Sequence, residues 1–108
     1  MAFRGQNFVS VWCNFNGNGT IAIRDSFNCS SLTDHGVGNY QVNFSTACAN
    51  HAVACEGEES GDTNEGSAFA HLRNHSTNSN NTRVRTCTAD AGFFQDFEHV
   101  YVIVCHDG

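Results

Sequence analysis

The chain has 108 residues and a mass of 11.7 kDa, enough for one domain with a modest core and too little for two. It has no Pro, no Lys and thirty Asn, Ser and Thr residues, which weaken helices. The formal charge of -6 leaves no basic patch for phosphates, so nucleic acid is not expected as a partner. Apolar runs such as residues 100–105 are too short to span a membrane, and no apolar leader begins the chain. We therefore expect one all-β domain over residues 1–108, without membrane insertion.

The first predicted hairpin lies near the start of the chain. Residues 7–15 are rich in aromatic and β-branched residues, which predicts a strand. Asn and Gly alternate over residues 16–19, which predicts a tight turn with a two-residue loop. Residues 20–28 return as a strand whose alternation places Asp25 on the same face as the two Ile residues.

A second hairpin is predicted next. Residues 29–33 continue the preceding strand or bend away from it, and residues 34–38 contain two Gly residues that indicate a turn. The strand over residues 39–46 then presents one apolar face. The residues of that face are Tyr40, Val42 and Phe44.

The second half of the chain alternates short strands with polar loops. Residues 56–66 carry five carboxylates and no apolar residue, and residues 73–81 are mostly Asn and Ser, so both stretches predict solvated loops. Further strands are predicted at residues 52–55, 67–72, 82–88 and 98–105. About seven or eight short strands with no helical period predict an antiparallel β-sandwich or a small barrel, and we expect the sandwich.

Three Phe residues fall within residues 93–97, between the last two predicted strands. Aromatic side chains dominate burial, so this cluster is expected to close the core where strands cross. The alternative is a platform of rings for a ligand.

The six cysteines leave two interpretations open. An even number in a short chain is typical of a disulfide framework in secreted proteins. However, Cys13, Cys55 and Cys105 occupy positions where a strand places small apolar residues, so reduced core thiols are preferred.

Two short stretches contain residues that could bind a metal ion. Cys48, His51 and Cys55 offer three ligands in eight residues, but a structural zinc site needs a fourth. Residues 62–66 resemble a fragment of a calcium loop but lack its full spacing and its bidentate Glu. No metal or cofactor is expected.

The sequence predicts that the protein is not an enzyme. It contains no nucleophile elbow, no cysteine-protease signature, no dinucleotide-binding glycine motif and no phosphate-binding loop. The carboxylate pairs, such as Glu56 and Glu58, lie in a stretch where solvation explains them.

Residues 11–47 carry a long pattern of motifs. It reads Trp-x-Asn-Phe-x-Gly-x-Gly-Thr, then Ile-Arg-x-Ser-x-Asn-x-Ser-Ser, then Asp-x-Gly-x-Gly-x-Tyr-x-Val-Asn-Phe. This pattern closely resembles a module at the C-terminal end of tail fibre proteins of tailed bacteriophages. Residues 84–86 and 100–104 are similar to the last strands of that module, so the resemblance covers most of the chain.

The resemblance implies a virion structural protein, assembled in the host bacterial cytoplasm and commonly trimeric. Its partners would be further copies of itself, other virion proteins and a receptor on the bacterial surface. Relatives tend to carry Val or Met at the positions of Cys13, Cys29 and Cys48, which agrees with small apolar thiols.

As a fibre tip, the chain would contact a surface glycan through its polar loops and its Phe cluster. The expected receptor-binding residues are Asp62, Asn64, Asn74, Asn78, Asn80, Phe93 and Phe94. Arg83 and Arg85 share one face of a predicted strand in an acidic chain, so they are expected to form salt bridges at the oligomer interface.

Two alternative functions remain open. The chain would stabilise the capsid if it were a decoration protein or a head spike, with its loops as the solvated outer surface. A free carbohydrate-binding module without a role in the virion is the second alternative.

Overall fold

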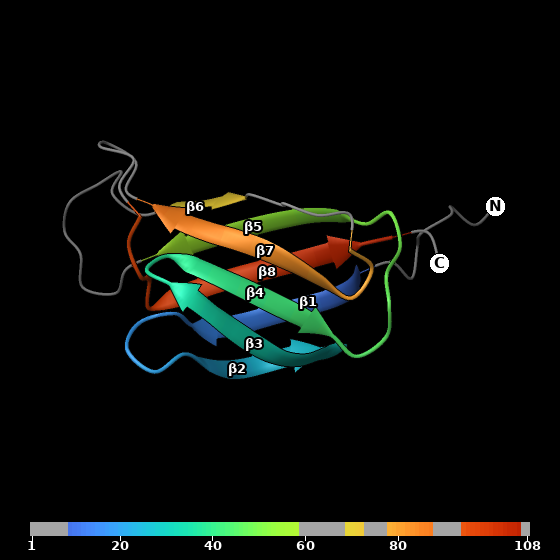
Figure 1. The fold of residues 1–108 in the computed structure, drawn as a ribbon, viewed down its shortest axis with the longest axis horizontal. Coiled ribbons are helices and arrows are strands. Elements are labelled where there is room, and N and C mark those ends of the chain that lie inside the picture. Colours follow the sequence, from blue (N-terminus) through green and yellow to red (C-terminus); the bar gives the residue numbers. More distant parts are fainter. Residues whose placement is uncertain (1–8, 59–68, 73–77, 88–93, 107–108) are drawn as a thin grey trace.

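The computed structural model describes residues 9–58, 69–72, 78–87 and 94–106, which form two antiparallel sheets packed face to face (Figure 1). The strands are β1 (Val9–Asn16), β2 (Ala22–Phe27), β3 (Cys29–Gly36), β4 (Asn39–Phe44), β5 (Ala52–Glu58), β6 (Phe69–Leu72), β7 (Asn81–Cys87) and β8 (His99–Cys105). One sheet has the order β2-β1-β8-β5 and the other has the order β3-β4-β7-β6. The predicted all-β sandwich is confirmed. The described ranges contain no helix, and so none that could cross a membrane.

The core lies between the sheets and is built from alternate residues of the four central strands. The rings of Phe15 on β1 and Tyr40 on β4 meet edge to face across it, with centroids 5.2 Å apart. The inward residues of these strands are Val11, Cys13, Phe15, Tyr40, Val42, Phe44, Thr82, Val84, Thr86, Val100, Val102 and Val104. β-Branched residues predominate, as expected where side chains pack on a pleated surface.

Asn28 carries the chain from β2 in one sheet to β3 in the other. Its φ of 56° is left-handed, a conformation that Asn tolerates better than most residues. Its side-chain amide donates hydrogen bonds to the carbonyl oxygens of Ser10 and Thr46, both at 3.1 Å. Its Oδ1 accepts a bond of 2.7 Å from the Thr46 amide. This one side chain therefore joins β1 to the segment that follows β4.

The segment between β7 and β8 closes the sandwich at the end where β1 finishes. Phe97 is fully buried, and its carbonyl accepts a hydrogen bond of 2.8 Å from Gly17. Asp96 accepts a bond of 2.7 Å from the Gly38 amide, and its carboxylate also lies 3.0 Å from the Tyr40 hydroxyl. The expected role of the Phe cluster in core closure thus belongs to Phe97.

A β-bulge makes the predicted facing of Asp25 wrong. The register between β1 and β2 pairs Asn14 with Asp25 but Phe15 with Ile23, which leaves Arg24 as the extra residue. Ile23 is half-buried, whereas Asp25 is exposed with Arg24. Strict alternation fails here because one inserted residue reverses the facing of the rest of the strand.

The predicted two-residue loop at residues 16–19 is also wrong. β1 ends at Asn16 and β2 begins at Ala22, so a longer segment connects them. A Cβ atom on Gly17 would lie 2.5 Å from the Tyr40 hydroxyl oxygen. Packing of this loop against the core therefore sets its path, rather than the geometry of a tight hairpin.

Two loops are predicted to begin at residues that the structure places in the preceding strand. β3 continues to Gly36, and the turn that follows uses Gly38 at a φ of 58°. β5 continues through Glu56 to Glu58, which pairs with His99 on β8. Hydrogen bonding along β8 keeps this acidic stretch extended, although its composition alone predicts a loop.

All six cysteines are free thiols in the structure. Cys13, Cys48 and Cys87 are buried, whereas Cys105 is exposed because it lies on the outward side of β8, so its expected burial is wrong. The Sγ atoms of Cys13 and Cys29 are 3.8 Å apart, across the two sheets. This hydrogen-bond contact, together with burial, raises the pKa of Cys13, and the same contact lowers the pKa of Cys29.

Candidate functional site

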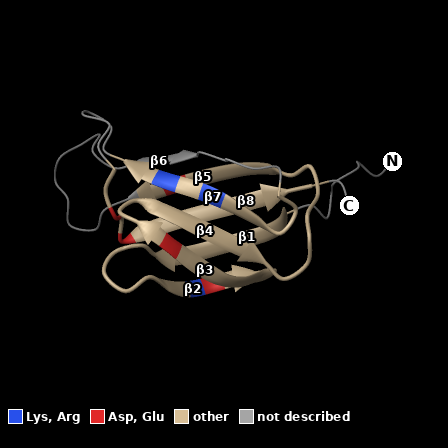
Figure 2. Cartoon of the chain, in the orientation of Figure 1, with Lys and Arg blue, Asp and Glu red and all other residues tan. Residues whose placement is uncertain are grey.

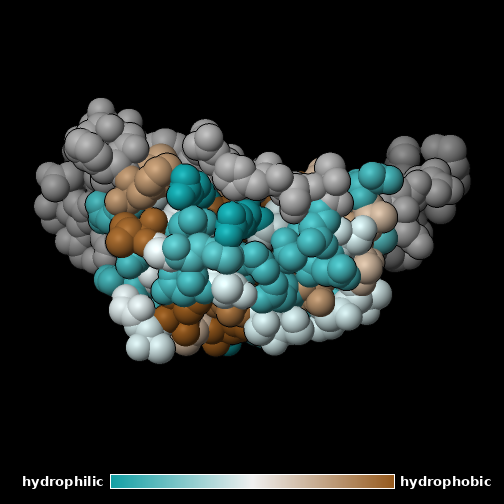
Figure 3. All heavy atoms as spheres, in the orientation of Figure 1, coloured by the Kyte–Doolittle hydropathy of each residue, from teal (hydrophilic) through white to brown (hydrophobic). Residues whose placement is uncertain are grey.

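The candidate site is the outward side of the sheet β3-β4-β7-β6, which we call the amide face. It faces the viewer in Figure 3, where hydrophilic side chains gather over the centre of the molecule. The register of β4 and β7 places Gln41 beside Arg83 and Asn39 beside Arg85. The described members of the amide face are Ser31, Thr33, His35, Asn39, Gln41, Asn43, Asn81, Arg83 and Arg85.

Hydrogen bonds between side chains organise the centre of the amide face. Gln41 donates to Asn43 Oδ1 at 2.7 Å, and Asn43 Nδ2 lies 3.0 Å from both Ser31 Oγ and Thr33 Oγ1. On the other side, His35 Nε2 lies 3.0 Å from Gln41 Oε1. Since that amide oxygen can only accept, His35 Nε2 carries the proton in this arrangement.

This array leaves hydrogen-bonding capacity directed at solvent. Ser31 and Thr33 accept from Asn43, so the O–H of each hydroxyl remains available to donate outward. A flat surface with fixed donors and acceptors is suited to a ligand with several hydroxyl groups.

Arg83 and Arg85 form the cationic part of the amide face. They are the two blue positions on β7 in Figure 2. Neither forms an ion pair with a residue in the described ranges, and the Nε atom of each is buried without a hydrogen-bond partner there. The Cζ atom of Arg85 lies 4.0 Å from the centre of the Phe94 ring, which is a cation–π contact.

The structure separates the residues that were predicted to bind a receptor. Asn78 and Asn80 shape the turn before β7, where Asn78 Oδ1 accepts a bond of 2.8 Å from the Asn80 amide. Phe94 lies at the other end of β7, where its backbone forms an isolated β-bridge with Cys87. The remaining predicted residues lie outside the described residues, namely Asp62, Asn64, Asn74 and Phe93.

Sequence analysis missed His35, Gln41 and Asn43 as candidate binding residues. The signal was present in residues 39–44, where every second residue is an amide while the others are apolar. Its meaning depends on the register that places β3 and β7 on either side of β4.

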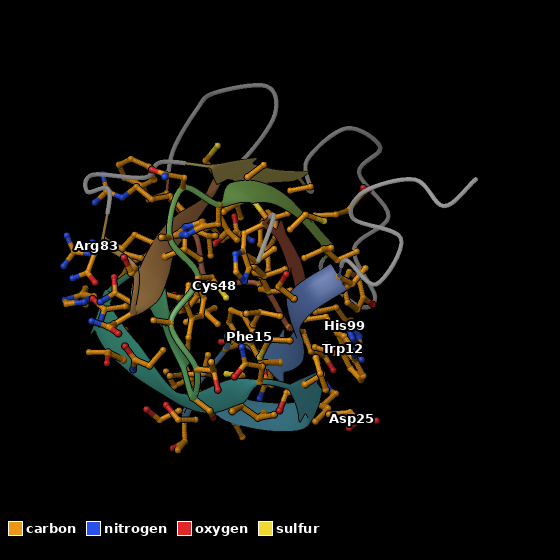
Figure 4. The ribbon with its side chains drawn as sticks, turned by 90° about the vertical axis from the view of Figure 1, so that its right-hand side faces the viewer. Trp12, Phe15, Asp25, Cys48, Arg83 and His99 are labelled. Atoms are coloured by element: carbon orange, nitrogen blue, oxygen red, sulfur yellow. The ribbon has the colours of Figure 1, made fainter. Side chains whose placement is uncertain are left out.

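No metal centre is formed by the described residues, where no three His, Cys, Asp or Glu side chains gather. In the stretch with three possible zinc ligands, Cys48 points into the core (Figure 4), and its carbonyl oxygen lies 2.8 Å from His51 Nδ1. The ring of His51 packs edge to face on Phe44, with centroids 5.3 Å apart. The calcium-like residues 62–66 are outside the described ranges.

The outward side of the other sheet, which we call the aromatic face, has a different character. Strand pairing aligns Phe27, Trp12, Ile103 and Ala54 in one row across four strands. Phe27 is 55% exposed and Ile103 is 46% exposed. Figure 4 shows Trp12, His99 and Asp25 on this side of the sandwich and Arg83 on the opposite side. A shallow pocket here is lined by Ala54, Cys55, Glu56, Tyr101 and Ile103.

Comparison with known proteins adds no relative. No protein family, no curated protein and no solved structure matches the chain.

Proposed function

We propose that this chain is a bacteriophage virion structural protein of the tail fibre or fibre-tip type, which binds a glycan on the host surface. The sequence pattern that resembles tail fibre modules supports the assignment to a virion. The two-sheet fold agrees with a binding module, and the described residues include no cluster of metal-binding side chains.

The observation that carries glycan binding is the hydrogen-bonded array of Gln41 and Asn43 on the amide face. Its side chains are already fixed by one another, so little conformational entropy is lost when a ligand binds. Sugars present many hydroxyl groups that both donate and accept hydrogen bonds, as the Ser31 and Thr33 hydroxyls do.

The proposed assembly is a homotrimer, and we assign the apolar row of the aromatic face to the contact between copies. Phe27 and Ile103 are large apolar side chains that a monomer leaves half in water. Burial of apolar surface drives most protein association, at roughly 25 cal/mol per Å² of area removed from water.

The test of glycan binding uses the purified full chain on an array of bacterial surface glycans. Asn43→Ala removes the centre of the hydrogen-bonded array and is expected to weaken binding at least about tenfold, as loss of one or two hydrogen bonds implies. Asn14→Ala is the matched control, because it makes the same change on the aromatic face. Equal binding by both variants and the unchanged chain would argue against this site.

A role as a capsid decoration protein or head spike is the second candidate, and the exposed apolar row favours it. The row would then contact capsid subunits. Mass spectrometry and immunogold labelling of purified virions distinguish the candidates. Label on the tail supports the proposal, label on the head supports the decoration role, and absence from particles supports a free carbohydrate-binding module.

A further inference from the structure

We propose that Arg83, Arg85 and Phe94 form a subsite for the acid group of an acidic glycan. This inference rests on the proposed glycan binding and adds the class of sugar that is bound. The acid group is a carboxylate or a phosphate, and the two share the oxyanion chemistry that a guanidinium recognises.

The charge distribution supports an anionic ligand. Arg83 and Arg85 are two residues apart on the same side of β7, which places their Cα atoms about 7 Å apart. The chain as a whole carries a formal charge of -6, yet neither guanidinium meets a carboxylate of a described residue. Two neighbouring cations that meet no carboxylate of the described residues form a patch of positive charge that attracts an anion.

Unused hydrogen-bond donors point the same way. A guanidinium has five N–H donors, and no described residue accepts a hydrogen bond from the side chain of Arg83 or Arg85. The Nε atom of each is buried without a partner among the described residues, so both side chains lie in a partly desolvated setting that strengthens an ionic hydrogen bond. A carboxylate or phosphate can engage the terminal N–H groups of a guanidinium with two parallel bonds.

Phe94 orients one of the two arginines before any ligand arrives. The Arg85 guanidinium lies over its ring at 4.0 Å, and the ring itself remains 42% exposed. Stacking holds the planar fork in place and so lowers the entropic cost of binding. The exposed part of the ring is available to the apolar side of a sugar.

Neighbouring amides extend the subsite toward the rest of the sugar. Gln41 lies beside Arg83 and Asn39 beside Arg85 in the register of β4 and β7. The Oδ1 atom of Asn39 has no hydrogen-bond partner among the described residues. An acid group at the arginines would thus place the rest of the sugar beside the Gln41 and Asn39 side chains.

The experiment measures binding of three soluble oligomers by isothermal titration calorimetry. Oligogalacturonate supplies carboxylates, its fully methyl-esterified form is the matched neutral ligand, and glycerol-phosphate oligomer supplies phosphates. We expect one of the acids to bind at least about tenfold more tightly than the ester, since an ionic hydrogen-bonded pair contributes on that scale. The tighter of the two acids identifies the source of the acid group.

Variants then test the named residues. The double variant R83Q/R85Q keeps amide donors but removes both charges, and it should bind acid and ester alike. R24Q is the control, because Arg24 lies in the other sheet and donates to the Glu98 carbonyl at 2.7 Å. Light scattering accompanies each variant.

Each outcome decides between the two proposals. Equal binding of acids and ester by the unchanged chain overturns the acidic subsite but leaves glycan binding intact. No binding to these ligands or to the glycan array overturns both. A changed number of subunits in R83Q/R85Q, with unchanged acid binding, overturns the subsite and assigns the arginines to the contact between copies.

Discussion

The two outer faces of the sandwich have the same architecture and opposite chemistry. On both, a central strand pair turns alternate residues outward while the other residues fill one shared core. The amide face carries side chains that hydrogen-bond one another, with two arginines beside them. The aromatic face carries a row of rings and aliphatic groups.

This difference shows that the fold depends on the inward-facing residues of each strand more than on the outward-facing ones. Hydrophobic burial constrains the inward residues, so they are similar in the two sheets. The outward residues are free of that constraint, and their chemistry therefore carries information about partners. A polar, organised face suits a hydrated ligand, whereas an apolar face suits another protein surface.

The largest effect is expected from a change in the core that both faces share. Phe15→Ala removes a fully buried ring and should lower the free energy of unfolding by about 3–5 kcal/mol. Urea unfolding is followed by Trp12 fluorescence for the aromatic face and by the NMR signal of His35 for the amide face. The two probes should give one midpoint.

Val37→Ala is the control, because that side chain is 61% exposed and lies outside the proposed contact between copies, so its loss should cost less than about 1 kcal/mol. Different midpoints for the two probes would show that the faces belong to separately folding units.

A smaller loss is expected at the crossing between the sheets. Asn28→Ala removes the side chain that bonds Ser10 and Thr46, and should lower the free energy of unfolding by about 2 kcal/mol. Asn28→Gly permits the φ of 56° but also lacks the amide, so it should be destabilised to a similar extent. Wild-type stability of the Gly variant in thermal unfolding would mean that backbone conformation alone matters.

Alkaline pH should weaken both sheets together. Burial raises the pKa of Cys48 and Cys87, and burial followed by the charge of Glu56 raises that of Cys55 to about 11. Their stabilising contribution is complete below the unfolded pKa of about 9 and is lost as the pH rises through the folded pKa. Burial, with a contribution from Asp96, also raises the pKa of Tyr40, which extends the loss above pH 10.

The measurement is the unfolding midpoint in urea from pH 7 to pH 11 under reducing conditions. Cys55→Ala in one sheet and Cys87→Ala in the other should each reduce the dependence on pH between about 9 and 11. A midpoint that rises with pH in this range would contradict the direction of the shifts.

Substitutions of outward-facing residues are expected to change stability least. They should also distinguish the roles of the two faces most clearly. Ile103→Asp should lower the free energy of unfolding by about 1 kcal/mol and reduce the number of subunits measured by light scattering. Asn43→Ala should leave that number unchanged and weaken glycan binding. Loss of both properties in either variant would show that the faces do not act independently.

Sequence reasoning succeeded where the pattern is local. The alternation of Tyr40, Val42 and Phe44 was sufficient to predict which side of β4 is buried. It failed at Arg24, because a bulge depends on the partner strand and not on the sequence of β2 alone. It also failed at Glu56, where pairing with β8 overrides composition.

The candidate site was less accessible to prediction than the fold. Arg85 and Phe94 were assigned to different roles, as an interface residue and a receptor-binding residue, and the structure brings them into contact. The hydrogen-bonded array needs β3, β4 and β7 in one register, and that register is set by contacts between distant parts of the chain.

The pairing of β1 with β8 also has a consequence for synthesis on the ribosome. β1 ends at Asn16 and β8 begins at His99, yet they are central neighbours in one sheet. At translation rates of about 5–20 residues per second, the nascent chain waits several seconds with an open strand edge before its partner emerges. Cellular factors that shield unpaired strands should therefore raise the yield of this protein more than they raise that of a helical protein of equal length.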